Sequence, residues 1–289
     1  MPSYRFCRPD DIPYLVRAVN ECYDVHFPGG EPMTVDRFRA EMKELDVWPS
    51  NSMVASSGEG PIAVLIGTKR PREVLIRRLG VRPGHRRQGH GRHLVTSLGQ
   101  KLAVLGPERL VAEVPRALPG AAGFFSAAGY RREATYVDWS RPPATVEPVP
   151  EELFIPTTVD ELIEHGLLPA DRGAAWERQR ETLVNRKDGL RGLAVASPER
   201  LEAFLLHRAA EDGSVVEVVA AGSRESEQRE VFLSLLLRHL AGGSEGGLSV
   251  PKLAAEGRAP GELPSTVLAT LGFEAGDRHD RYAAAATPA

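Results

Sequence analysis

The stretch from Val81 to Leu94 limits what this 289-residue chain can fold into more than any other part of its sequence. It reads Val-Arg-Pro-Gly-His-Arg-Arg-Gln-Gly-His-Gly-Arg-His-Leu, and it joins a predicted strand at about 73–81 to an amphipathic helix at about 89–105. Glycines let a backbone approach a ligand closely, and the first N–H groups of a helix have no partner within the helix. The pattern therefore predicts an anion site where a strand is followed by a helix.

The polar residues of this loop suit a phosphate group. The candidate ligands are Arg86, Arg87, Gln88, Gly89, His90, Gly91 and Arg92. Arginine offers fork-shaped donors that match phosphate oxygens. His85, His90 and His93 lie among arginines with no set of Cys or carboxylate ligands, so we expect them to flank the phosphates and not to hold a metal. A solvated basic loop or a nucleic-acid patch is the alternative, and it leaves the position of the glycines unexplained.

Helical and strand periodicities place the other elements of the first half. Strands are predicted at 4–7, 52–56, 62–68, 110–114 and 130–139, and helices after Asp10 or Asp11, after Thr34 and at 121–128. In the strand at 73–81, the doublet Arg77-Arg78 interrupts the alternation of apolar and polar residues. The interruption indicates a β-bulge, and an arginine that simply reaches solvent at a strand edge is the alternative.

The second half repeats this order of elements. Its helices are predicted at 158–166, 176–184, 231–240 and 263–271, and its strands at 193–196, 201–207, 215–221 and 248–253. Thr158 with Glu161 forms a capping box at the first of these helices. Residues 140–150 hold four prolines and have the composition of an extended linker. We therefore predict two similar α/β domains, at 1–140 and 151–289.

In this order and context, residues 4–139 resemble the GNAT superfamily of acyl-CoA-dependent N-acyltransferases. The family's signature, Gln/Arg-x-x-Gly-x-Gly/Ala between the fourth strand and the third helix, is matched by Arg86, Gly89 and Gly91. The opening Arg8-Pro9-Asp10-Asp11 and the later Ala128-Gly129-Tyr130 also match the family's pattern. The resemblance implies an α/β fold with a mixed sheet and, with the second half, two tandem GNAT-like domains.

The resemblance also implies where acetyl-CoA lies and what reaction it undergoes. The fourth and fifth strands diverge, and the pantetheine arm of acetyl-CoA pairs with the fourth strand between them. Backbone groups at Leu79, Gly80 and Val81 would stabilise the oxyanion that forms when a neutral amine attacks the thioester. The implied activity is N-acetylation of a primary amine by direct transfer.

The chain departs from the family where catalytic groups are often found. Phe125, a candidate cofactor contact, occupies the position of the tyrosine that protonates the thiolate, and Leu118 that of a frequent asparagine. Leu75 occupies the usual position of a base. Glu73, on the same predicted face, is the first candidate base, and Glu113, in the fifth strand, is the second. Carboxylates in such positions are more often structural than catalytic, so a structural role is the alternative for each. Tyr23, His26 and Tyr136 are further residues that could reach the reacting groups.

The corresponding loop of the second half does not suit a phosphate. Residues 222–230 lack the spaced glycines and carry Glu225, Glu227 and Glu230, which would repel an anion. We therefore expect residues 151–289 to be a degenerate GNAT-like domain that binds no CoA.

Composition and charge exclude several other classes of protein. The sequence is 42% hydrophobic and 26% charged, as globular proteins are, and its net charge of −3 favours neither nucleic acid nor an anionic membrane as partner. No apolar run is long enough to cross a bilayer, and the first residues do not resemble a secretory signal. Cys7 and Cys22 are then most simply free thiols of a cytoplasmic protein.

Two alternatives to an enzyme stay open at the level of sequence. A non-catalytic acyl-CoA sensor is favoured by Phe125 and Leu118, and a nucleic-acid or scaffold protein is favoured only by the arginine cluster. For an enzyme, the acceptor is a small-molecule amine or a protein amine. The sequence carries no motif that chooses between these two acceptors, and none that gives the oligomeric state.

Overall fold

The computed structural model describes residues 2–27, 29–143, 149–168, 173–210, 214–244, 246–255 and 262–286. The chain divides into two compact units, which are considered one at a time. The first unit holds residues up to Val114, the segment Leu118–Glu133 and the chain from Arg281 onward. The second unit holds Pro115–Ala117 and Ala134–Asp280.

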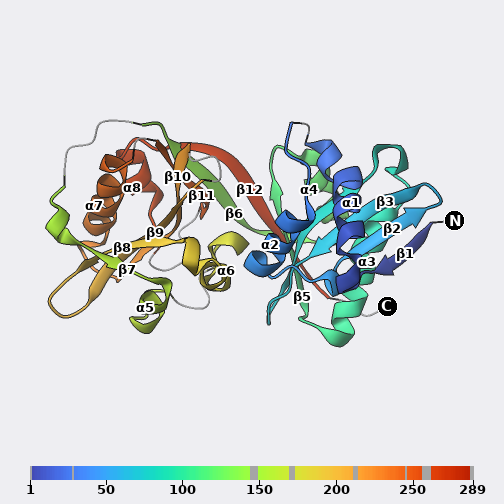
Figure 1. Cartoon of the computed structure of the whole chain (residues 1–289), viewed down its shortest axis with the longest axis horizontal. Helices are drawn as coiled ribbons and strands as arrows, with labels where there is room; N and C mark the ends of the chain where they lie inside the picture. The colour runs from blue at the N-terminus through green and yellow to red at the C-terminus, as the bar shows by residue number, and fades with distance from the viewer. Residues whose placement is uncertain are drawn as a thin grey trace. The chain divides into compact units, whose positions relative to one another are not determined.

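The first unit is built on a mixed sheet in the order β1-β2-β3-β4-β5-β12 (Figure 1). Its strands are β1 (Ser3–Phe6), β2 (Met53–Ser57), β3 (Gly60–Gly67), β4 (Val74–Val81), β5 (Arg109–Pro115) and the end of β12 (Glu274–Ala285). Strands β1 to β4 pair antiparallel, whereas β5 runs parallel to β4. The parallel pair is connected through a helix, as a parallel connection requires.

The helices of the first unit are α1 (Ile12–Cys22), α2 (Val35–Leu45), α3 (His90–Leu105) and α4 (Pro119–Ala127), and α2 packs against α1. As predicted, Thr34 caps α2, and its hydroxyl accepts a hydrogen bond from the Arg37 N–H at 3.2 Å. The apolar stripe of α3, including the fully buried Leu94 and Leu98, packs with residues of β2 to β5 and α4 in one core. Helix α1 packs on β3 from the other face of the sheet, so both faces are covered.

The β-bulge predicted in β4 is confirmed. On β3 the neighbours Ile66 and Gly67 pair with Arg78 and Ile76 of β4, so Arg77 is the extra residue. The bulge reverses which residues of β4 face α3: Val74 and Ile76 do so before it, and Leu79 and Val81 after it. It therefore sets the direction of every side chain from the middle of β4 to its end at Val81, where the loop of residues 82–89, called the Gly/Arg loop below, begins.

The second unit repeats this plan, with the sheet order β12-β6-β11-β10-β9-β8-β7. Its strands are β6 (Arg131–Arg141), β7 (Phe154–Thr157), β8 (Arg191–Ala196), β9 (Leu201–Ala209), β10 (Val215–Ser223), β11 (Gly247–Ala254) and β12. Its helices are α5 (Val159–Glu164), α6 (Arg180–Asn185), α7 (Arg229–Gly242) and α8 (Ser265–Thr270). The predicted capping box opens α5: the Thr158 hydroxyl accepts from the Glu161 N–H, and the Glu161 carboxylate accepts from the Thr158 N–H.

The two units are not contiguous halves of the sequence. Strand β6 is divided between them after Glu133, and β12 is divided after Asp280. These two strands are neighbours in the sheet (green and red in Figure 1). The predicted boundaries at residues 140 and 151 therefore do not follow the units, because a local sequence pattern does not specify which sheet a strand joins. Part of the predicted linker, residues 144–148, lies outside the described residues.

Cys7 and Cys22 are both free and buried, as predicted for thiols. Burial raises the pKa of the Cys7 thiol to about 12 and that of Cys22 to about 11, so both stay protonated near neutral pH. Within the described residues, no helix combines the length and the apolar character needed to span a membrane.

Candidate functional site

The central feature of the first unit is the divergence of β4 and β5. The two strands pair at Val74 with Leu110 and at Leu75 with Val111. Beyond Leu75, β4 continues to Val81 and β5 to Pro115, and the described residues contain no further pairing between them. The edge of β4 that faces β5 is therefore open to an extended ligand, which could pair with it as a strand would.

Backbone direction identifies the groups on that open edge. The Arg82 N–H donates to the Ile62 carbonyl of β3 at 2.9 Å, so the peptide groups of Arg82 point toward β3. Since alternate residues of a strand point their peptide groups to opposite sides, those of Leu79 and Val81 point toward the divergence. Gly80 has a different function in packing: a Cβ there would lie 2.2 Å from the Cys22 carbonyl oxygen, so Gly80 allows α1 to approach β4.

The loop between β4 and α3 adopts the conformation that its glycines permit. It passes through a 3-10 turn (Pro83–His85) and reaches α3 with Gly89 at the N-cap in the left-handed region, at φ +86°. Arg87 also has a positive φ, of 64°, which is unusual for a residue other than glycine. Such backbone strain occurs preferentially at ligand sites, because the surrounding structure must hold it in place.

The arginines of the loop are exposed, and two of them have protein partners. The guanidinium of Arg86 lies 2.5 Å from Nδ1 of His26, and that of Arg92 donates to the Ala127 carbonyl at 2.6 Å. The amide of Gln88 donates to the Gly84 carbonyl at 3.3 Å. The loop therefore presents positive charge at the N-terminus of the 16-residue helix α3, where the helix dipole adds to it.

His90, the first residue of α3, is buried beneath this surface. Its Nδ1 lies 2.6 Å from the hydroxyl of Tyr4, whereas its Nε2 is buried without a hydrogen-bond partner in the described residues. Burial, with smaller contributions from His85 and His93, lowers the pKa of His90. Within the described chain no group of three or more His, Cys, Asp or Glu side chains could hold a metal ion.

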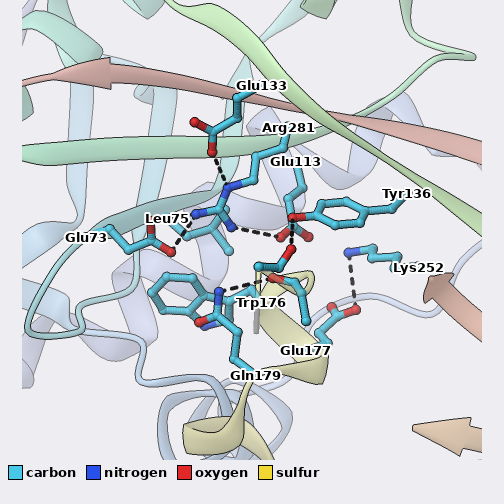
Figure 2. A network of polar contacts seen from close by, with 12 residues as sticks. Glu73, Leu75, Glu113, Glu133, Tyr136, Trp176, Glu177, Gln179, Lys252 and Arg281 are labelled. Atoms are coloured by element: carbon cyan, nitrogen blue, oxygen red, sulfur yellow. Dashed lines mark hydrogen bonds and ion pairs between the residues drawn. The ribbon is translucent and has the colours of Figure 1, made fainter. Parts of the chain in front are cut away.

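The two candidate bases meet at Arg281, which the end of β12 brings into the first unit. Arg281 donates to both oxygens of Glu73, at 2.6 and 2.5 Å, and to Glu133 at 2.7 Å. Its Nη1 lies 3.8 Å from Glu113. Figure 2 shows the three carboxylates converging on this guanidinium from different elements of the unit. Sequence reasoning missed Arg281, because no local signal links it to carboxylates so far away in the chain.

The two candidate bases, Glu73 and Glu113, lie on opposite sides of the point where β4 and β5 part. Glu73 precedes β4, whose first residue is Val74, and therefore lies before the point where the strands part. Glu113 lies on β5 beyond that point, and its side chain is 3% exposed. Glu73 also forms an ion pair with Arg109 at 3.3 Å, so its carboxylate is engaged by two guanidinium groups.

Phe125 belongs to the core of the first unit. It is 5% exposed, and its ring contacts Tyr130 edge-on and stacks on Tyr282 at a centroid distance of 6.2 Å. Tyr282, like Arg281, comes from the part of β12 that joins the first unit. Leu118 is the N-cap residue of α4. Two tyrosine rings thus lie beside the family's usual position: Tyr130 at a centroid distance of 5.2 Å, and Tyr282, contributed by the far end of the chain, at 6.2 Å.

In the second unit, β10 and β11 diverge in the same way, after three pairs that end at Glu217 and Ser249. Arg178 fills the divergence: it is 2% exposed and donates to the Val218 carbonyl of β10 at 2.9 Å and to the Pro251 carbonyl of β11 at 3.2 Å. Its charge is balanced by Glu262 at 3.1 Å, and the backbone of Glu262 forms a bridge with Gly222 at the end of β10. The protein's own groups thus occupy the edge that is open in the first unit.

Comparison with known proteins agrees with this description. The sequence profile of the acetyltransferase (GNAT) family matches residues 15–130, a range that contains the whole junction of β4 with α3. Residues 15–130 thus contain a domain that matches the GNAT profile. No curated protein matches the sequence at a significant level.

Solved structures with similar folds extend over the whole chain. A GCN5-related N-acetyltransferase from Sphaerobacter thermophilus matches with a TM-score of 0.68 at 16% identity, covering 99% of this chain and 96% of its own. A tandem GNAT protein from the clavulanic acid biosynthesis pathway matches with a TM-score of 0.62 at 19% identity, covering all of both chains. A putative acetyltransferase from Pyrococcus horikoshii matches with a TM-score of 0.62 at 15% identity, covering 99% and 90%. The predicted fold, two tandem GNAT-like domains with a mixed sheet, is confirmed.

Proposed function

We propose that this protein is an N-acetyltransferase that moves an acetyl group from acetyl-CoA to a primary amine by direct transfer. The observation that carries the proposal is the junction of β4 with α3, where an open strand edge leads into a Gly/Arg loop at a helix N-terminus. An extended amide chain suits the edge, and a pyrophosphate suits the loop. Acetyl-CoA joins these two chemical groups in one molecule.

The proposed reaction is a direct acyl transfer from the thioester to the amine. The amine nitrogen attacks the thioester carbonyl carbon, a C–N bond forms, the C–S bond breaks, and CoA leaves as a thiolate. The N–H groups of Leu79 and Val81 point toward the divergence and are the candidate donors to the oxyanion of the tetrahedral intermediate. The reaction gains further from holding the two reactants in place.

Glu113 is the better candidate to accept the amine proton, directly or through water. It lies beyond the point of divergence, whereas Glu73 lies before it with both oxygens bound by Arg281. Arg281 would hold the Glu113 carboxylate in position from 3.8 Å away. Glu73 then acts as a structural partner of Arg281.

The proposal is tested with purified full-length protein, acetyl-CoA and a panel of small amines and peptides with free amino groups. We expect free thiol to be released in an amine-dependent way, with matching acetylated product by mass spectrometry. A second candidate, an acyl-CoA sensor, is favoured by the buried Phe125 at the usual acid position. Tight CoA binding with no turnover on any amine would favour the sensor, and no CoA binding would contradict both functions.

The first prediction concerns the pH dependence of the acetylation rate. With Phe125 in place of a hydroxyl, we expect the rate to rise with pH and to show no falling limb below about pH 9. A thiol titrates near ~8.5 and can leave as thiolate, whereas an alkyl amine titrates near ~10 and must lose a proton first. The measurement is kcat/KM against pH. A bell-shaped profile would contradict this account, and its loss in Tyr130→Phe or in Tyr282→Phe would identify that tyrosine as the acid.

The second prediction is a stoichiometry of one CoA per chain. In the second unit, Arg178 bridges the Val218 and Pro251 carbonyls. The loop of residues 222–230, which corresponds to the Gly/Arg loop, carries glutamates where a phosphate would bind. Titration calorimetry with the full chain measures the stoichiometry directly. Two CoA molecules bound per chain would show that the second unit also takes the cofactor.

A further inference from the structure

His26 lies on the open edge that the proposed cofactor would use. It follows α1 in a short 3-10 turn (Asp24–His26), and its Nε2 lies 3.0 Å from the Val81 carbonyl oxygen. A carbonyl can only accept, so Nε2 carries the proton and donates. The peptide groups of Val81 point toward the divergence of β4 and β5, and His26 therefore occupies one of the positions where an extended amide chain would bind.

The same imidazole also holds an arginine of the Gly/Arg loop. Nη2 of Arg86 lies 2.5 Å from Nδ1 and 2.8 Å from Nε2 of His26. With Nε2 donating to the Val81 carbonyl, Nδ1 is the ring nitrogen that can accept from Arg86. One side chain thus contacts both a backbone acceptor of β4 and a guanidinium of the proposed phosphate site. A ligand that binds at both places has to break both contacts.

The turn that carries His26 is attached at its base and exposed at its tip. Asn20 and Met33 exchange two hydrogen bonds, at 3.0 and 2.8 Å, across the base of this segment. On either side of His26, Val25 is 49% exposed and Phe27 is 40% exposed. Phe27 contacts the Tyr23 ring at a centroid distance of 5.0 Å, yet both Val25 and Phe27 keep exposed apolar surface that a moved turn can place against a ligand.

We infer that His26 is a gate on the cofactor edge: entry of acetyl-CoA displaces it from Val81, releases Arg86 toward the phosphates, and moves the turn of Val25 and Phe27. The inference rests on the proposed function and names the side chain that the cofactor must displace to reach the β4 edge. The second unit provides a contrast, since Arg178 fills the equivalent edge with a buried, charge-balanced side chain that cannot be displaced as readily.

The test compares CoA binding by the wild-type chain with binding by three variants, using titration calorimetry and stopped-flow kinetics. His26→Ala removes the competing contact, and we expect CoA to bind about three- to ten-fold more tightly, as befits one hydrogen bond. His26→Gln keeps a donor for the Val81 carbonyl and should bind nearly as the wild type does. Val104→Ala removes an exposed apolar side chain near the C-terminal end of α3, away from the turn, and should leave the affinity unchanged.

A second measurement follows the imidazole itself. In the wild-type chain, nitrogen NMR should show the Nε2–H form of His26 held before CoA is added, and its signals should shift to those of a free imidazole when CoA binds. Equal or weaker CoA binding by His26→Ala, or unchanged His26 signals on saturation, would overturn the gate while leaving the proposed function standing. No CoA binding by the wild-type chain and all variants would overturn the proposed function, and the gate with it.

Discussion

Replacing Gly91 by glutamate is expected to abolish CoA binding while the chain stays folded. Gly91 is the second residue of α3, and a Cβ there would contact the Phe124 ring at 3.4 Å and Val81 Cγ2 at 3.7 Å. Both distances are those of ordinary van der Waals contacts. The carboxylate, however, would lie where the pyrophosphate is proposed to bind, and two like charges ~4 Å apart repel by about 4 kcal/mol near a protein surface, roughly a thousand-fold in affinity.

The fold should tolerate this change because an acidic residue in the first turn of a helix is favourable. Gly89→Glu should also abolish binding, but its φ of +86° adds backbone strain, which makes Gly91 the cleaner test. Gly99→Glu is the matched control, since it lies on the same helix and its Cβ would have nothing within 4 Å. Calorimetry gives the affinity and circular dichroism the fold. An affinity for Gly91→Glu equal to that of the control would contradict the cofactor assignment.

Arg281→Met is expected to destabilise the chain by about 3–5 kcal/mol, the usual effect of removing one partner from a buried ionic network. Arg281 is 8% exposed and serves Glu73, Glu113 and Glu133, whose charges would lose their main counter-ion. Methionine keeps most of the side-chain volume, so the change measures the lost charge and hydrogen bonds more than a lost contact.

Arg109→Met is the control for this prediction. Arg109 also pairs with Glu73 and Glu133, but it is 47% exposed, and an exposed pair contributes at most about 1 kcal/mol. Urea unfolding of the two variants and the wild type supplies the comparison. Similar small effects from both substitutions would show that the buried network contributes little to stability.

Local patterns were sufficient to predict most elements of the first unit and the cofactor loop. The stripe of α3, the cap at Thr34 and the bulge at Arg77 each depend on residues that lie within a few positions of one another. The glycines at 89 and 91 indicated a ligand site because a strand-to-helix junction with spaced glycines exposes backbone donors. The capping box of α5 and the order of elements in the second unit were also predictable, because they too depend on residues close together in the sequence.

Only the tertiary structure determined which unit the last strand joins and which distant residues come into contact. Nothing in the sequence of strand β12 indicates that its residues from Arg281 onward join the first unit. Hydrogen bonds between Arg281 and Glu73 connect residues 208 positions apart. The contact of His26 with Val81 and the filling of the second divergence by Arg178 are likewise long-range. The sequence by itself determined the elements and the phosphate loop, since short-range periodicity and capping encode them. Only the tertiary structure determined which carboxylates share a guanidinium and which strand edges are open, because strand pairing and side-chain burial depend on residues that the chain brings together from a distance.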